Sequence, residues 1–599
     1  RAARTVIRNA RVFVGDRRGT VARAIAIGWD GRILAVGSER ELHRLKGRRT
    51  EVVDAAGGTV IAGIHDGHVH PMYAGLRALN PSLGDAELTA AEVTSLVSGF
   101  LADPAYGGEP DAWLTVEGWN PAGTPSDTLP DRALLDTLAT ARPLALNGSD
   151  GHNLWVNTRA LDLAGIDDAT PDPVGGEIVR DGTGRATGVL KDAAQDLVRS
   201  LVPEPTPEQM YDAFARAFAE MAAGGITTVM DAWVEEWQLD FYRALADNGA
   251  LPQRVTAALL APQEVLGAPG DVLAEFRRLA HAYDDVPRLR FGTAKVFMDG
   301  VIEYPAQTAA LLEPYLDENG VPTDHYGDLY VDAATMGAFS TVLDAAGWQV
   351  HAHAIGDAAV RAALDGYAAA RAANGLRGPL HAIAHLQLVH PDDYPRFAAL
   401  RVVPNMQLQW ATRNVWTMDA LLPYIGPERH RRMYPARSLL AAGAPLAGGS
   451  DWPVDPLYPW NQVQTAIDRT GLYGEGEPLY PEQGISRRAS LLMHTRATAY
   501  QLRQAGRTGT LAPGKQADLV VLDRDLTTCP VAEIHQAVPQ LTMVGGETTF
   551  DLSTSTGRAT RRSMERAAKA ATAVGAGRVA HEDLPGRTAG CPCTAGATH

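Results

Sequence analysis

Residues 59–70 read TVIAGIHDGHVH, an apolar run followed by two histidines at alternate positions. The run TVIAGI predicts a buried β-strand over residues 59–64. Side chains alternate along an extended chain, so His68 and His70 project to the same side. Alone, this pattern is weak evidence for a site, because 17 histidines in 599 residues produce an H-x-H by chance roughly once in two such chains.

Seven further apolar runs alternate with stretches of helical periodicity, which predicts βα units and a parallel sheet. With the first run they make eight units, so we expect an α/β chain built on a (β/α)8 barrel of the TIM type. The helix before the second strand begins with a capping box, Thr206 and Gln209, and stops at Gly224. The seven further predicted strands are residues 226–231, 254–260, 289–299, 348–355, 380–388, 401–408 and 444–451.

The two ends of the chain carry short alternating strands, in residues 1–58 and 496–552. Neither end has enough strands to bury a face alone, so we expect them to form one small composite β-sandwich. The barrel would then comprise residues 59–71 and 204–495. Residues 72–203 exceed a normal βα connection and predict an inserted subdomain over the active site. Residues 553–599, rich in Ala, Gly, Thr and Arg, are expected to be a partly helical or disordered extension.

Composition and charge narrow the range of partners. Lys and Arg number 54 against 70 Asp and Glu, a net charge of −16, which disfavours a role on nucleic acid or anionic membrane and favours a small-molecule partner. No apolar run is long enough for a transmembrane helix, and the start at Arg1 lacks a signal-peptide pattern, although a processed upstream segment stays possible. The only cysteines are Cys529, Cys591 and Cys593, which predicts a reducing, cytoplasmic location, with the Cys591 and Cys593 pair an incidental feature of the tail.

Residues of metal-ligand type also stand at the ends of other predicted barrel strands. Active sites of this barrel collect at the C-terminal strand ends, so residues distant in sequence become neighbours there. Imidazoles with carboxylates suit Zn²⁺ or a similar divalent ion. Taken singly, a buried His is usually a hydrogen-bonded core residue and an Asp after a strand is usually a turn or cap, but an unpaired buried lysine is costly. The candidate ligands are His68, His70, Lys295, His353, His385 and Asp451.

This order of ligands on successive strands resembles the amidohydrolase superfamily, in particular its branch containing N-substituted formamide deformylase and related amidohydrolases. The resemblance runs from about residue 5 to residue 552. The segments that carry it most strongly are EGWN (117–120), LNGSDGHNLWVNTRAL (146–161), GGEIVRDGTGRATGVLKDAA (175–194), MDGVIEYPAQTAALLEPY (298–315), HAHAIGDAAV (351–360) and TGTLAPGKQADLVVLD (508–523).

Carried over by position, the resemblance implies one or two divalent ions, zinc above all. His68 and His70 would bind one metal, and His353 and His385 a second. Asp451 would touch the first metal and act as proton shuttle.

Lys295 would bridge the metals as a carbamate formed with CO₂, which turns a buried cation into an anionic oxygen ligand. His351 and His381 are interpreted as residues that support the ligand histidines or the fold. One departure concerns the position before His385, where the family often has an acidic residue and this chain has Ala384. That departure puts the orientation of the His385 ring in question, though not its role as a ligand.

Several residues are candidates for contact with substrate. Similar family segments lie over the active site, so Asp150 is a candidate substrate contact and His152 either polarises the scissile carbonyl or binds substrate; the alternative is that His152 ties down its own loop. Trp119, Glu303 and Trp452 follow strand or loop ends expected to face the pocket, with simple packing as the alternative.

The expected reaction is hydrolysis of the C–N bond of an amide, an N-substituted formamide being the sharpest hypothesis. A metal-activated hydroxide would attack the carbonyl, and Asp451 would transfer the proton to the leaving nitrogen. A mononuclear deaminase is disfavoured, because residues 353–357 read HAIGD and lack a His-x-x-Glu pattern. A cyclic-amide or ester hydrolase of the same superfamily and a catalytically silent metal-binding regulatory protein stay open. A homodimer is the expected assembly.

Overall fold

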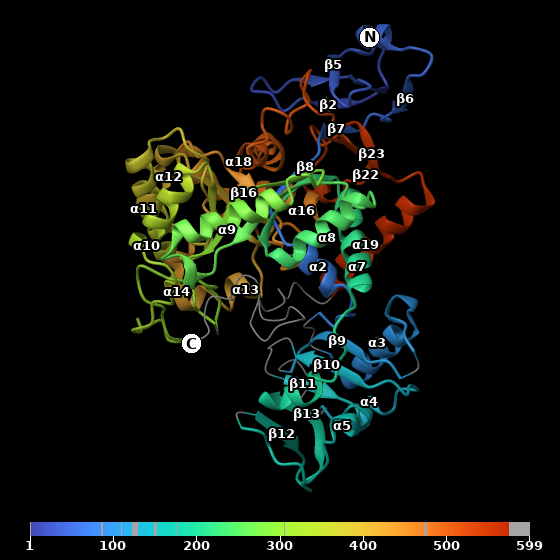
Figure 1. The fold of residues 1–599 in the computed structure, drawn as a ribbon, viewed down its shortest axis with the longest axis vertical. Helices are drawn as coiled ribbons and strands as arrows, with labels where there is room; N and C mark the ends of the chain where they lie inside the picture. The colour runs from blue at the N-terminus through green and yellow to red at the C-terminus, as the bar shows by residue number, and fades with distance from the viewer. Residues whose placement is uncertain are drawn as a thin grey trace. The chain divides into compact units, whose positions relative to one another are not determined.

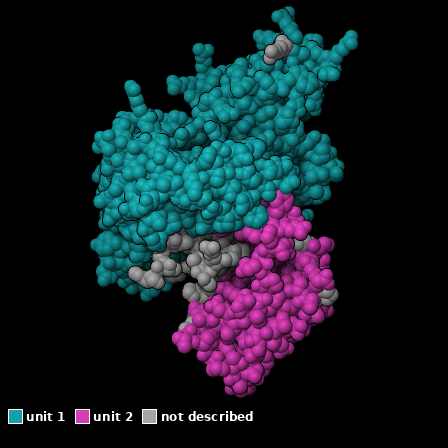
Figure 2. Space-filling view, viewed as in Figure 1, with its two compact units in different colours: residues 1–71, 215–568, 596–599 teal, residues 72–214, 569–595 magenta. Residues whose placement is uncertain are grey.

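A computed structural model of the chain describes residues 2–84, 88–109, 111–121, 130–148, 153–174, 176–304, 306–472 and 476–573. The chain divides into two compact units (Figure 2). The first comprises residues 1–71 and 215–568, and the second residues 72–214. Within the described residues, no helix combines the length and apolar character needed to cross a membrane.

An eight-stranded, all-parallel sheet forms the barrel of the first unit (Figure 1). Its first and last strands meet near their C-terminal ends, where Asp451 N donates to His68 O at 2.8 Å and His70 N donates to Trp452 O at 2.9 Å. The predicted TIM-type barrel is therefore confirmed. In spatial order the strands are β8 (Ile64–Val69), β14 (Ile226–Val234), β15 (Arg254–Leu260), β16 (Leu289–Phe297), β17 (Gln349–Ala354), β18 (Ala382–His385), β19 (Val403–Met406) and β20 (Ala447–Gly448).

Helices alternate with the barrel strands along the chain, and their apolar faces are buried. In α7 (Pro207–Ala223), Gln209 N donates to Thr206 Oγ1 at 3.2 Å and Thr206 N to Gln209 Oε1 at 2.9 Å, so the predicted capping box is present. The other helices between barrel strands and after the last strand include α8 (Glu236–Asp247), α9 (Pro269–Ala282), α10 (Ala333–Ala345), α11 (Asp357–Asn374), α12 (Tyr394–Leu400), α15 (Ala436–Ala441) and α16 (Pro459–Asp468).

The prediction that residues 59–64 form the first barrel strand is wrong, because most of this segment belongs to a separate strand outside the barrel. Residues Thr59–Ala62 form β7, which pairs with β2 (Arg11–Phe13) and β21 (Leu519–Leu522) outside the barrel. The barrel strand begins only at Ile64 and contains His68. Gly63 separates the two strands, and a Cβ atom there would lie 2.1 Å from Thr227 Cγ2, so only glycine permits this close crossing.

The two chain ends meet in a β-sandwich, as expected from their short alternating strands. One sheet has the order β23-β22-β21-β7-β2-β3 and mixes strands from both ends of the chain. The second sheet has the order β5-β4-β1-β6. Apolar side chains of both sheets, among them Ile25, Val60 and Leu519, share one buried core. The strands not yet defined are β1 (Thr5–Arg8), β3 (Val21–Ala22), β4 (Ala24–Ile27), β5 (Ile33–Gly37), β6 (Glu51–Asp54), β22 (Pro539–Val544) and β23 (Glu547–Asp551).

The chain beyond the sandwich continues as helix α19 (Ser555–Ala573). Ser563 Oγ of this helix donates to Glu220 Oε1 at 2.7 Å. Cys591 and Cys593 lie outside the described residues.

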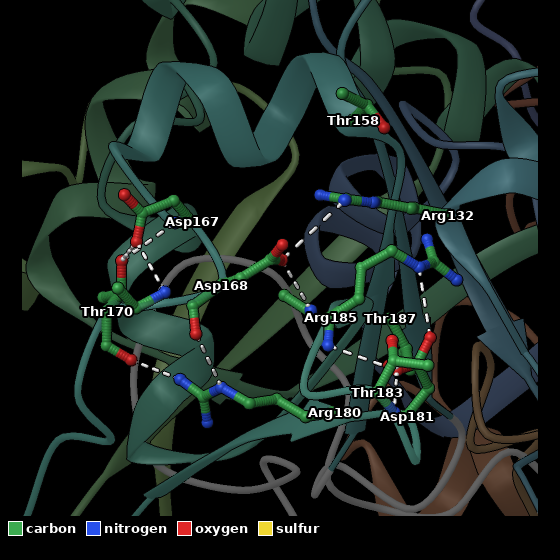
Figure 3. A network of polar contacts seen from close by, with 12 residues as sticks. Arg132, Thr158, Asp167, Asp168, Thr170, Arg180, Asp181, Thr183, Arg185 and Thr187 are labelled. Carbon is green, nitrogen blue, oxygen red and sulfur yellow. Dashed lines mark hydrogen bonds and ion pairs between the residues drawn. The ribbon is translucent and has the colours of Figure 1, made fainter.

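The second unit has a five-stranded sheet of its own, in the order β12-β13-β11-β10-β9. Figure 3 shows a polar network in this unit: Arg180 Nε donates to Asp168 O at 3.3 Å, and Arg185 Nε donates to Asp181 Oδ2 at 3.1 Å. The first contact ties the turn around Asp168 to the β12–β13 hairpin, and the second lies within that hairpin. The strands are β9 (Leu114–Trp119), β10 (Leu144–Gly148), β11 (Asn153–Val156), β12 (Gly176–Arg180) and β13 (Ala186–Asp192), accompanied by α3 (Ala90–Ala102), α4 (Arg132–Leu135) and α5 (Thr158–Ala164).

Candidate metal centre

The barrel strands bring predicted ligands from distant parts of the chain to one place. Asp451, which follows β20, lies beside three histidines. Its Oδ1 is 3.1 Å from His70 Nε2 and 3.4 Å from His68 Nε2, and its Oδ2 is 3.8 Å from His385 Nδ1. His353 joins the group through its ring, whose centroid lies 4.5 Å from that of His385.

Lys295 occupies the adjoining position on β16. It pairs in register with His351 of β17, and Phe297 pairs with His353. The Lys295 side chain is fully buried, with Nζ 4.5 Å from the centroid of the Phe297 ring. Lys295 thus lies buried in the barrel beside the candidate ligands of β17.

Burial favours the neutral form of three imidazoles at the candidate centre. Burial is the largest cause that lowers the pKa of His68, His351 and His385 well below the ordinary value, and neighbouring cationic groups lower it further. A neutral imidazole keeps a nitrogen lone pair, which is the form that binds a metal ion.

The residues present fit a divalent cation. Nε2 of His68 and Nε2 of His385 are buried and make no hydrogen bond within the described part of the chain. His68, His385 and Asp451 each offer one donor atom, and the three atoms lie within 4.8 Å of one another. Buried nitrogen and carboxylate donors so arranged are the donor set of a zinc-type ion.

Two of the candidate ligand imidazoles make a contact through one ring nitrogen. Nδ1 of His68 lies 2.8 Å from Nε2 of His351, and Nε2 of His353 lies 3.0 Å from Gly300 O. Such contacts fix the ring plane and select the nitrogen that faces the metal. His351 therefore contacts a candidate ligand on β8, whereas His353, two positions further along β17, is itself a candidate ligand.

Two aspartates that the sequence analysis did not single out support the centre. Asp66 Oδ1 accepts from Ser450 N at 2.9 Å, which holds the chain next to Asp451, and burial raises the pKa of Asp66 to about 7. Asp299 accepts from Ile355 N and Gly356 N at 3.0 and 2.8 Å, and burial raises its pKa to about 8. Both aspartates stand directly before a glycine, within a barrel strand or just after one. This Asp-Gly pattern is the sequence signal that could have identified them as residues of the site.

His381 has a structural role at the other end of β18. Its Nε2 lies 3.0 Å from Asp344 Oδ1, its Nδ1 accepts from Val350 N, and its ring stacks on Tyr367. His385 has Ala384 before it, yet its ring is held by stacking on Trp410 at 5.6 Å with an interplanar angle of 6°. The Trp410 ring is therefore one contact that restrains the His385 imidazole.

Unusual backbone conformations occur at two of the candidate ligands. His385 has φ +79° and Asp451 has φ +55°, both in the left-handed region that non-glycine residues seldom occupy. Such conformations persist only where the surrounding structure imposes them, and they cluster at functional sites.

The candidate substrate residues have different surroundings. Glu303 is buried and accepts from Gln387 Nε2 at 2.9 Å, and Trp452 is half-buried directly after Asp451. Trp119 lies in an apolar core of the second unit, beside Trp155 at a centroid distance of 5.3 Å, so its local environment is one of packing. Asp150 and His152 lie outside the described residues, and their roles stay predictions.

Comparison with known proteins agrees with this architecture. N-substituted formamide deformylase of Arthrobacter pascens is 28% identical over 560 residues, covering 90% of this chain and 97% of that protein. Protein LONG AFTER FAR-RED 3 of Arabidopsis thaliana is 29% identical over 533 residues, covering 86% of each chain. An uncharacterized metal-dependent hydrolase from Pyrococcus furiosus superposes with a TM-score of 0.66 at 23% identity, over 88% of this chain and all of that one.

The family model described as "Amidohydrolase family" matches residues 51–550, which span the whole barrel and about half of the strands of the β-sandwich. The matched region contains every candidate metal ligand. The chain therefore belongs to the amidohydrolase family.

Proposed function

We propose that this protein is a metal-dependent hydrolase that cleaves the C–N bond of an amide. The observation that carries the proposal is the position of the fully buried Asp451 carboxylate, 3.1 Å from His70, 3.4 Å from His68 and 3.8 Å from His385. A carboxylate at this position would lie close to both a bound metal ion and the reacting group of the substrate. It could therefore accept and donate a proton where the C–N bond breaks.

A divalent ion, zinc by preference for these donors, would be held by histidines and one carboxylate, with carboxylated Lys295 as the bridging ligand if two ions bind. When bound, the ion supplies Lewis acidity, lowering the pKa of a water molecule toward about 7 and polarising a carbonyl oxygen. The residues proposed to hold it are His68, His70, Lys295, His353, His385 and Asp451.

Asp451 provides the general acid–base chemistry. One of its carboxylate oxygens accepts the proton of the attacking water, and the same group returns that proton to the leaving nitrogen. The neutral histidines cannot replace it in this role, because burial keeps their pKa values well below the ordinary one.

Two further groups are assigned to substrate. Glu303, held by Gln387 Nε2, is proposed to contact a polar group of the substrate. His152 is proposed to polarise the scissile carbonyl.

An N-substituted formamide is the specific substrate that we propose. The support is the similarity, over 90% of this chain, to the N-substituted formamide deformylase of Arthrobacter pascens. The test incubates zinc-reconstituted protein with N-substituted formamides, N-acyl amino acids, cyclic amides and esters, and measures release of amine, acid or alcohol. We expect metal-dependent amine release, fastest with a formamide. Turnover of esters alone, or of no substrate class by metal-replete protein, would contradict the proposal.

A further inference from the structure

A second site is indicated by a cavity in the first unit, with a volume of about 840 Å³. Four basic side chains line it, from Arg17, Arg401, Arg496 and Lys515, and the acidic side chain in its lining is Asp16. The remaining wall is mainly apolar and includes Pro445, Leu492, Ala497 and Tyr500. This volume lies within the range of cavities that enclose small organic ligands.

The cavity and the candidate metal centre lie at opposite ends of the barrel strands. Arg401 closely precedes β19, and Gly443 and Pro445 precede β20, so the cavity lies at the N-terminal ends of these strands. His385 and Asp451 stand at C-terminal strand ends. The outer wall comes from loops of the β-sandwich that contain Arg17 and Lys515.

The positive charges in the cavity are not balanced by the protein. Among the described residues, no carboxylate lies within ion-pair distance of the four basic groups, and Lys515 Nζ donates to two backbone oxygens, Ala505 O at 2.6 Å and Thr508 O at 3.1 Å. The Asp16 carboxylate is engaged by Thr20, whose N and Oγ1 donate to it at 2.9 and 2.7 Å. Burial lowers the pKa of Lys515, and the charge of Arg496 lowers it further, as expected of neighbouring cations. In a chain of net charge −16, such a local excess of cations favours an anionic ligand.

Two of the three guanidinium groups have no hydrogen-bond partner among the described residues. The side chains of Arg17 and Arg496 make no hydrogen bond to any other described residue, whereas Arg401 NH1 donates to Leu376 O and Arg401 NH2 is 3.5 Å from Tyr500 Oη. Arg401 has φ +54°, and Arg496 lies on the π-helical turn Met493–Ala497. Local conformations of this kind are often retained at functional sites.

We propose that this cavity binds a small organic phosphate. A phosphate group with three acceptor oxygens and up to two negative charges can engage Arg17, Arg401 and Arg496 together, whereas a carboxylate is matched by a single guanidinium. The organic part of the ligand packs on Pro445, Leu492 and the Tyr500 ring.

The test is calorimetric titration of the metal-replete full chain with phenyl phosphate and, separately, inorganic phosphate. We expect one phenyl phosphate per chain, bound more tightly than inorganic phosphate and more weakly as the salt concentration rises. Loss of a charge-assisted contact in Arg17→Gln or Arg496→Gln should weaken binding about tenfold. Arg18→Gln is the matched control, because Arg18 is exposed like its neighbour Arg17 but does not line the cavity.

Metal content and melting temperature, measured on the same samples, verify that both variants fold. Absence of phenyl phosphate binding to the wild-type chain would overturn the proposal. Binding that both cavity variants retain would also overturn it, because the ligand would then occupy the metal centre or another surface. If Arg18→Gln weakened phenyl phosphate binding as much as the cavity variants do, the effect would come from general surface charge. That result would also overturn the proposal.

Discussion

Nδ1 of His68 and Nε2 of His351 lie 2.8 Å apart, and both side chains are fully buried. If His68 binds a metal through Nε2, its proton resides on Nδ1 and is donated to His351. His351 thus determines which nitrogen of His68 faces Asp451.

Replacing His351 should weaken metal binding while the barrel stays folded. His351→Leu removes the acceptor, and we expect metal affinity to fall about 10–100-fold. His351→Gln is the matched control, because its amide oxygen can accept the same hydrogen bond. Chelator competition measures the affinity independently of activity. Equal metal affinity in His351→Leu and the wild type would show that the contact does not orient the ligand.

Asp451→Asn should separate metal binding from proton transfer. The amide keeps the shape and one metal-facing oxygen, but it cannot shuttle a proton at neutral pH. The variant is expected to fold, to keep much of its metal and to lose about 10²–10⁴-fold in turnover. Asp392→Asn, which alters a carboxylate with 83% side-chain exposure, is the control. Near wild-type turnover by metal-replete Asp451→Asn protein would move the shuttle role to another residue.

Lys295 should carry a carboxylate when two metal ions are bound. Protein prepared with ¹³C-bicarbonate is expected to show a carbamate carbon signal, and Lys295→Arg, which forms no stable carbamate, should lose both this signal and one metal ion per chain. Metal analysis and carbon NMR provide the measurement. An unmodified lysine beside a single fully occupied metal would instead establish a mononuclear centre.

His494 should make stability depend on pH. It is buried, and burial lowers its pKa from 6.5 to about 4, so the unfolded chain binds more protons than the folded chain between these values. Stability therefore falls as pH decreases from 6.5 toward 4, and the pKa difference corresponds to about 3 kcal/mol. Urea unfolding at saturating metal should show a smaller loss over this window for His494→Gln. His281→Gln, at an exposed histidine, is the control, and an unchanged pH profile for His494→Gln would contradict the prediction.

His152→Ala tests the role assigned to the insert. If His152 acts on substrate, turnover should fall while metal content and melting temperature stay close to wild type. Loss of metal or of folding in this variant would favour the alternative in which His152 holds its own loop.

The sequence by itself determined the class of the fold and the chemical identity of the candidate ligands. Both are encoded locally: strand and helix periodicities alternate along the chain, and the H-x-H at His68 and His70 follows an apolar run. The capping box at Thr206 is equally local, because its two residues lie three positions apart, and the structure confirms both of its hydrogen bonds.

Only the tertiary structure decided which similar residues reach the centre. His351 and His381 both precede a candidate ligand, yet His351 contacts His68, 283 positions away, and His381 contacts Asp344. The division of residues 59–69 at Gly63 depends on the approach of Thr227, another long-range contact. Alternation along a strand fixes only the side to which a residue points. Which residue it meets there depends on the register and closure of the whole barrel, and no local pattern encodes these.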